Sequence, residues 1–142
     1  MLEFYNARIP EWKNVDYYCN TYRSYECRSG TALGAFSALE STLKNDLLQW
    51  EITAARYMND ENHLINTISS YSKEIQTLRQ ETYDKEMPAV KRQSHFRRMA
   101  TLNALRNQKQ SHLNLIADVL ILICRRVRKL RAASAGDANR SE

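Results

Sequence analysis

The side chains in this sequence that could do metal or redox chemistry are few and widely spaced. The 142 residues include three cysteines, Cys19, Cys27 and Cys124, and no Cys-x-x-Cys pair. Zinc sites and dithiol redox motifs need closely spaced cysteine pairs. On one helix face Cys19 and Cys27 would be separated by about 12 Å, which is too far for a disulfide. We therefore expect free thiols in a reducing compartment.

The histidines do not form a ligand set either. His63 follows an acidic pair in the run Asp60-Glu61-Asn62-His63, which combines residue types that bind metals. In the helical register derived below, however, His63 and His112 lie on different faces. The sequence also lacks a glycine-rich phosphate loop, GxSxG, HExxH and the calcium-loop pattern. We therefore predict a protein that is not an enzyme, with no catalytic residues, no cofactor, no metal and no small-molecule substrate.

Helix-breaking residues are scarce in the elements that would position such side chains. The chain has only three glycines and two prolines. Between residues 31 and 87 the only one of these is Gly34, and residues 89–135 contain none. A fold built from strands needs many turns, which these two residue types usually supply. The composition therefore predicts an all-α protein.

Both long stretches carry mostly apolar residues at alternating steps of three and four, which is the spacing of a coiled-coil seam. In the first stretch one set of seam positions is Phe36, Leu43, Trp50, Tyr57, Leu64, Tyr71 and Leu78. In the second stretch the matching set is Met99, Arg106, Leu113, Leu120 and Val127. The pattern continues for several heptads in each stretch, so we expect the two helices to pack along these seams.

The two stretches also match each other in antiparallel register. Facing residues can be chosen so that their numbers sum to 177, as for Leu64 with Leu113 and Leu78 with Met99. The midpoint falls beside Pro88, which suits the first turn of a new helix. The predicted fold is therefore a long antiparallel coiled-coil helical hairpin over residues 31–134, with arms of about 31–87 and 89–134. An N-terminal aromatic-rich helical segment (1–30) precedes it, and a flexible polar tail (135–142) follows it.

The N-terminal segment carries seven aromatic residues, Phe4, Tyr5, Trp12, Tyr17, Tyr18, Tyr22 and Tyr25. Residues 11–87 could form one helix, or a short helix could end near Arg28 and a new one start at Thr31. The run Ser29-Gly30-Thr31 favours the break, because it combines a stop signal with a cap. The second arm is too short to cover residues before about 43. The segment must therefore fold back as a third helix or pair with another chain.

Residues 119–124 (VLILIC) are apolar on every face of a helix, so more than one surface must cover them. The first arm can cover one side, and we expect a second copy of the chain to cover the other and complete a bundle. The predicted oligomer-interface residues are Trp50, Tyr57, Leu120, Ile121 and Ile123.

Charge is distributed unevenly along the chain, whose net charge is +5. Residues 31–87 carry five basic and nine acidic groups, whereas residues 88–134 carry eleven basic and one acidic group. The arms should attract each other, and cations also suit the C-terminal end of a helix. The basic residues that exceed the acidic ones are concentrated at the tip of the hairpin and at the end of the second arm. The residues predicted to contact an anionic partner are Lys91, Arg92, Arg97, Arg98, Arg125, Arg126, Arg128 and Lys129.

These patterns favour a non-catalytic scaffold or adaptor that self-associates or joins a larger complex, with its basic patches docked on an acidic surface. One alternative is a membrane-associated BAR-like helical module that binds anionic lipid. A second is a nucleic-acid-binding viral or mobile-element accessory protein. It is less favoured, because few aromatic residues are interleaved with the basic ones for base stacking. We expect a cytoplasmic location, with a peripheral membrane or nuclear one as alternatives, because the sequence has neither a signal peptide nor an apolar run long enough to cross a bilayer.

Overall fold

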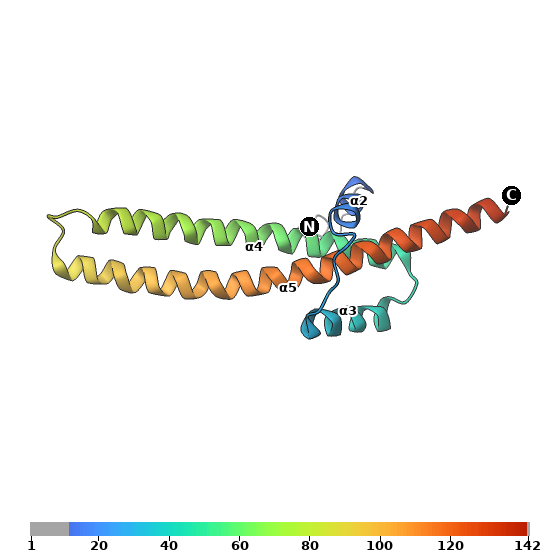
Figure 1. The fold of residues 1–142 in the computed structure, drawn as a ribbon, viewed down its shortest axis with the longest axis horizontal. Helices are drawn as coiled ribbons and strands as arrows, with labels where there is room; N and C mark the ends of the chain where they lie inside the picture. Colours follow the sequence, from blue (N-terminus) through green and yellow to red (C-terminus); the bar gives the residue numbers. More distant parts are fainter. Residues whose placement is uncertain (1–11, 142) are drawn as a thin grey trace, which may run out of the picture. The chain divides into compact units, whose positions relative to one another are not determined.

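The computed structural model describes residues 12–141, with side chains as far as Gly136, and this part of the chain forms four helices and no strand. They are α2 (Trp12–Thr21), α3 (Gly30–Leu43), α4 (Leu47–Thr82) and α5 (Ala89–Ser141) (Figure 1). The predicted all-α class is confirmed. Part of the predicted aromatic-rich segment, including Phe4 and Tyr5, lies outside the described residues.

The chain divides into two compact units. Unit 1 consists of residues 1–61 and 115–142, and unit 2 consists of residues 62–114. α4 and α5 each supply residues to both units, whereas α2 and α3 belong to unit 1 alone.

The predicted break before residue 31 is present in unit 1. The Ser29 hydroxyl oxygen accepts a 3.2 Å hydrogen bond from the backbone N–H of Ala32, so Ser29 is the N-cap of α3. The preceding helix ends at Thr21, earlier than the predicted end near Arg28. The carbonyl oxygens of Tyr22 and Tyr25 accept hydrogen bonds from Arg125 of α5, and that of Tyr22 also accepts from the N–H of Tyr25 at 2.9 Å in a turn. These bonds favour the early end, because they replace the bonding pattern of α2.

The first arm, predicted as one helix over residues 31–87, is interrupted between α3 and α4. Lys44 has a φ of 51° and a ψ of −121°, and its N–H bonds to the Glu40 carbonyl oxygen at 3.0 Å, which closes α3. The Asp46 carboxylate then accepts a 3.3 Å hydrogen bond from the N–H of Gln49 and caps the first turn of α4. Three consecutive polar residues, 44–46, thus end one helix and start the next.

α5 runs on through the segment that the sequence predicts as a polar tail, as far as Ser141. Gly136 lies inside this helix, where glycine costs about 1 kcal/mol relative to alanine. The neighbouring residues Ala132, Ala133 and Ala135 are of the type with the highest helix propensity, so one glycine does not end the helix here.

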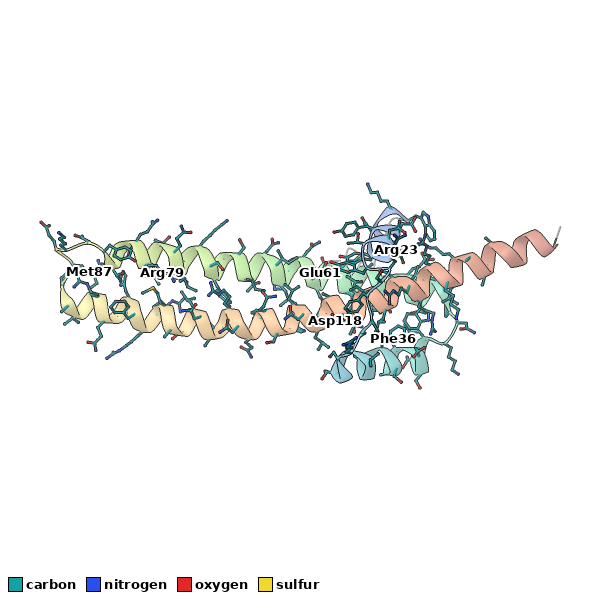
Figure 2. The ribbon with its side chains drawn as sticks, in the orientation of Figure 1. Arg23, Phe36, Glu61, Arg79, Met87 and Asp118 are labelled. Atoms are coloured by element: carbon teal, nitrogen blue, oxygen red, sulfur yellow. The ribbon has the colours of Figure 1, made fainter. Side chains whose placement is uncertain are left out.

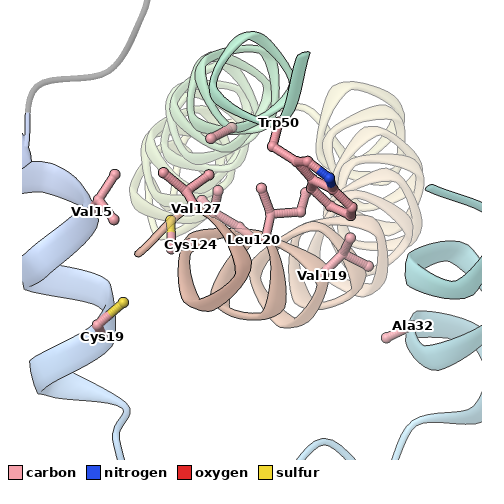
Figure 3. Close-up of a cluster of buried hydrophobic side chains, with 10 residues drawn as sticks. Val15, Cys19, Ala32, Trp50, Val119, Leu120, Cys124 and Val127 are labelled. Atoms are coloured by element: carbon pink, nitrogen blue, oxygen red, sulfur yellow. The ribbon is translucent and has the colours of Figure 1, made fainter. Parts of the chain in front are cut away.

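The core of unit 1 surrounds α5. In Figure 3, α2 and α3 lie on opposite sides of α5, with α4 alongside it. Four helices thus contribute to one buried cluster, whose members are Val15, Cys19, Ala32, Trp50, Ala54, Val119, Leu120, Ile123, Cys124 and Val127. The apolar band 119–124 of α5 is covered because α2, α3 and α4 pack against different faces of it.

Unit 2 pairs the second part of α4 with the first part of α5. Ile75 of α4 packs with Met99 and Leu102 of α5, and Tyr71 and Leu78 lie against this cluster. The seam positions predicted for residues 64–82 and 95–113 are all buried or half-buried. The Arg106 guanidinium reaches the Ser72 hydroxyl oxygen at 3.4 Å. The numbers of these two residues sum to 178, which differs by one from the sum of 177 that the predicted register gives for facing residues.

Candidate functional site

The residues predicted to contact a second chain lie in the core of unit 1. Trp50, Leu120 and Ile123 are completely buried, Ile121 is 4% exposed, and Tyr57 is half-buried. The prediction assigned the second cover of the apolar band to another copy of the chain. In the structure α2 and α3 cover it, so of the five residues only Tyr57 keeps appreciable surface that another chain could contact.

The basic cluster at the end of the second arm is also engaged within unit 1. Arg125 donates hydrogen bonds to the carbonyl oxygens of Tyr22 and Tyr25, the latter at 2.8 Å. Arg128 donates to the Asn20 side-chain oxygen at 3.2 Å, and its Nε lies 3.6 Å from the Asp16 carboxylate. These two arginines therefore hold α2 and the segment after it against α5.

Arg126 holds α3 in the same manner. Its guanidinium forms an ion pair with Glu40 and lies over the rings of Phe36 and Trp50, at 5.6 and 5.2 Å from their centroids. Only about a fifth of its side chain, 22%, is exposed. Arg126 was predicted to contact an anionic partner, but its charge is already matched by a carboxylate of its own chain. Lys129, by contrast, is exposed.

Two tyrosine–carboxylate pairs also join the parts of unit 1, and sequence reasoning did not find them. The Tyr18 hydroxyl donates to Glu61 at 2.5 Å, and the Tyr25 hydroxyl donates to Asp118 at 2.6 Å. Burial raises the pKa of Tyr18, and the bond to Asp118 raises that of Tyr25. Two features of the sequence could have indicated these pairs: Glu61 interrupts the apolar seam of the first arm, and Asp118 interrupts the apolar run of the second arm.

No group of three ligand-type side chains converges among the described residues. Glu61, the centre of the acidic run before His63, accepts from Tyr18 instead. All three cysteines are free thiols, and burial raises the pKa of Cys124 to about 12, which keeps it protonated.

The turn between α4 and α5 in unit 2 is organised by Asp84. Its carboxylate accepts from the N–H of Glu86 at 3.1 Å, and its carbonyl oxygen accepts from the N–H of Met87 at 3.2 Å and from Arg92 at 2.8 Å. Pro88 directly precedes α5, where its missing N–H costs no helical hydrogen bond. Figure 2 shows Met87 at this end of unit 2 and Arg79 on the neighbouring part of α4.

Large apolar side chains are exposed around this turn. Tyr83 is 76% exposed, Val90 82% and Phe96 53%. Tyr83 and Phe96 line a groove of about 490 Å³ together with Met99, and Arg79 is the only charged residue in its lining. We call the surface formed by Tyr83, Val90, Phe96 and this groove the tip surface.

The predicted basic residues of the tip differ in how far they are available. Lys91 and Arg97 are exposed, and their side chains form no ion pair with the described residues. The Arg98 guanidinium lies 3.3 Å from the Glu74 carboxylate. Arg92 is half-buried, and its guanidinium donates a hydrogen bond to the Asp84 carbonyl oxygen in the turn. Of the residues predicted at the tip, Lys91 and Arg97 are therefore the cations available to a partner, beside Arg79 in the groove.

Comparison of the chain with protein-family models, with curated proteins and with solved structures gives no match. Within residues 12–141, none of the helices combines the length and the apolar character needed to cross a membrane.

Proposed function

We propose that this protein is a non-catalytic scaffold or adaptor whose tip surface docks an acidic surface of a partner protein. In this proposal the paired parts of α4 and α5 form an antiparallel coiled-coil hairpin. The burial of the predicted seam positions in unit 2 supports that packing.

The observation that carries the proposal is the exposure of Tyr83 and Phe96 beside one groove, with Val90 exposed near the same turn. Proteins seldom leave a group of large apolar side chains in water unless another molecule covers it. Aromatic side chains and arginine are also enriched at the energetic centres of protein interfaces. A groove beside two exposed rings provides a place for a partner's apolar side chain.

The charge of unit 2 indicates which kind of partner surface fits. Residues 62–114 contain nine basic and four acidic residues, a net charge of +5. Two of the four carboxylates, Glu74 and Glu81, already lie beside Arg98 and His95. Complementary charge around the apolar contact favours an acidic partner and speeds its association.

Site-specific photocrosslinking in cells that express the protein tests this. A photoreactive amino acid would be placed at Phe96 and, in a matched control, at Ile65, an apolar residue of unit 2 that is 47% exposed. We expect adducts with a protein bearing an acidic surface at position 96 and few at position 65. Substitution of Lys91 and Arg97 by glutamate should then reduce the yield at position 96, whereas Lys73→Glu should not.

Three results would contradict the proposal. The first is equal crosslinking at positions 96 and 65, and the second is a yield that Lys91→Glu with Arg97→Glu leaves unchanged. The third is an adduct at position 96 made of lipid or nucleic acid. Co-sedimentation with anionic vesicles and filter binding across a salt series would identify the last two ligands directly, because binding to phosphate-rich surfaces weakens as salt rises.

Self-association is part of the same proposal and has its own measurement. Light scattering at low and high salt gives the mass of the particle in solution. A dimer that persists at high salt supports an apolar contact between copies, formed by surfaces other than the buried band. A monomer at both salt concentrations means that the adaptor acts as a single chain and removes self-association from the proposal.

A further inference from the structure

We propose that unit 1 contains a binding site for a small phosphate-bearing ligand, separate from the tip surface. The site is a pocket of about 320 Å³ between the end of α2 and the last part of α5. Its lining residues are Cys19, Arg23, Arg125, Arg128, Lys129 and Ala132. Figure 2 shows Arg23 just after α2.

The charge of the lining is the first argument. Four of the six lining residues are cationic and none is acidic. One carboxylate lies close by, because Asp16 is 3.6 Å from the Nε of Arg128. Even with that partner, three positive charges remain around one pocket. Cations so close together repel one another unless an anion joins them.

The second argument is that two of the cations are held in place before a ligand arrives. Arg125 uses its Nη2 for the bonds to Tyr22 and Tyr25, and Arg128 uses its Nη1 for the bond to Asn20 and forms an ion pair with Asp16. A guanidinium has five N–H donors, so each arginine keeps donors that these contacts do not use. Fixed donors lose little entropy when they bind an anion.

Arg23 and Lys129 differ from these two residues. Both are exposed, and neither side chain forms an ion pair with the described residues. They can therefore move toward a bound anion, and removing them should leave the packing of α2 on α5 intact.

The pocket favours phosphate over other anions. A carboxylate carries a single charge, which one bidentate arginine can match. A phosphate group carries more charge and three strong acceptor oxygens, so it can use several cations at once. The apolar part of the lining consists only of Cys19 and Ala132, which provides no ring on which a base could stack. The site therefore fits the phosphate or pyrophosphate portion of a small ligand.

Isothermal titration calorimetry with inorganic pyrophosphate on the full chain tests the site, with citrate as a carboxylate of comparable charge. We expect binding of pyrophosphate at moderate salt, and the double variant Arg23→Ala, Lys129→Ala should weaken it by about tenfold or more. The matched control Lys91→Ala, Arg97→Ala removes the same charge from the tip and should keep the wild-type affinity.

The thermal unfolding temperature gives a second reading, because a ligand that binds only the folded chain raises it. Pyrophosphate should raise it for the wild type and the tip variant, and by clearly less for Arg23→Ala, Lys129→Ala at the same concentration. The assignment is overturned if the wild type does not bind pyrophosphate, if both double variants lose affinity equally, or if citrate binds as tightly. A negative crosslinking result at the tip surface would contradict the proposed function but not this binding site, because the two tests use different residues and different ligands.

Discussion

The indole Nε1 of Trp50 donates a 2.7 Å hydrogen bond to the backbone carbonyl oxygen of Lys44. The donor is in the first turn of α4, and the acceptor is in the break between α3 and α4. One side chain therefore fills the core of unit 1, contacts Phe36 with ring centroids 5.5 Å apart, and fixes the path of the chain between two helices.

Substitution Trp50→Phe should lower the free energy of unfolding by about 2–3 kcal/mol, because it removes this hydrogen bond and leaves unfilled volume in the core. Denaturant unfolding measures the change. Trp12→Phe is the matched control, since Trp12 is 46% exposed, and it should cost far less. Equal losses for the two variants would show that the bond to Lys44 does not stabilise the chain.

Substitution Lys44→Gly should stabilise the protein by about 1 kcal/mol. Lys44 is the only non-glycine residue with positive φ in the described range, and its backbone conformation is one that glycine adopts more readily. A higher melting temperature would confirm this. The neighbouring change Asn45→Gly should lower it, because that residue lacks a positive φ, and the added freedom of the unfolded chain then dominates.

The tyrosine–carboxylate pairs should make stability depend on alkaline pH. The pKa values of Tyr18 and Tyr25 are raised in the folded chain, so their contribution is present below the ordinary tyrosine pKa of 10.0. Above that pH the unfolded chain loses protons that the folded chain retains. Stability should therefore fall as pH rises, by up to about 1.4 kcal/mol per pH unit for Tyr18 and by less for Tyr25, whose hydroxyl is more screened by solvent.

Unfolding measured at pH 9 to 11, a range of about one unit on each side of the ordinary tyrosine pKa, tests this effect. The double variant Tyr18→Phe, Tyr25→Phe should be less stable at neutral pH and should show a shallower alkaline decline. Tyr83→Phe is the control, because Tyr83 is 76% exposed. An unchanged slope in the double variant would mean that other groups cause the decline.

Substitution Arg126→Lys keeps the charge near Glu40 but removes the planar group that lies over Phe36 and Trp50. We expect a loss of about 1–2 kcal/mol, since lysine cannot replace a stacked guanidinium. Arg97→Lys, at an exposed position, should have little effect. Similar values for both variants would show that stacking of Arg126 adds nothing to the attachment of α3.

Periodicity predicted the two long helices and the burial of their seam positions, because both follow from residue spacing alone. The break at Lys44 was missed because Leu43 and Trp50 stay in heptad phase across it, and only the polar run 44–46 marks it locally. The roles of the arginines could not be read in advance. Arg97 and Arg126 look alike in a sequence, and only the packing of α3 against α5 distinguishes an exposed cation from a half-buried one.

The residues that cover the apolar band 119–124 also could not be predicted from the sequence. The composition of residues 119–124 required several covering surfaces, but it did not say whether they came from this chain or another. The small residues Val15, Cys19 and Ala32 provide them because they let α2 and α3 approach α5 closely. Short side chains carry little signal in a periodicity analysis.

The contact between Arg128 and Asn20 joins residues 108 positions apart in the chain. During synthesis α2 leaves the ribosome long before the part of α5 that will cover it, whereas the contacts of unit 2 span much shorter loops and close sooner. The face of α2 that carries Val15 and Cys19 must therefore stay exposed until the part of α5 around Cys124 and Arg128 has been made. A nascent chain of this protein should depend on chaperones through that interval.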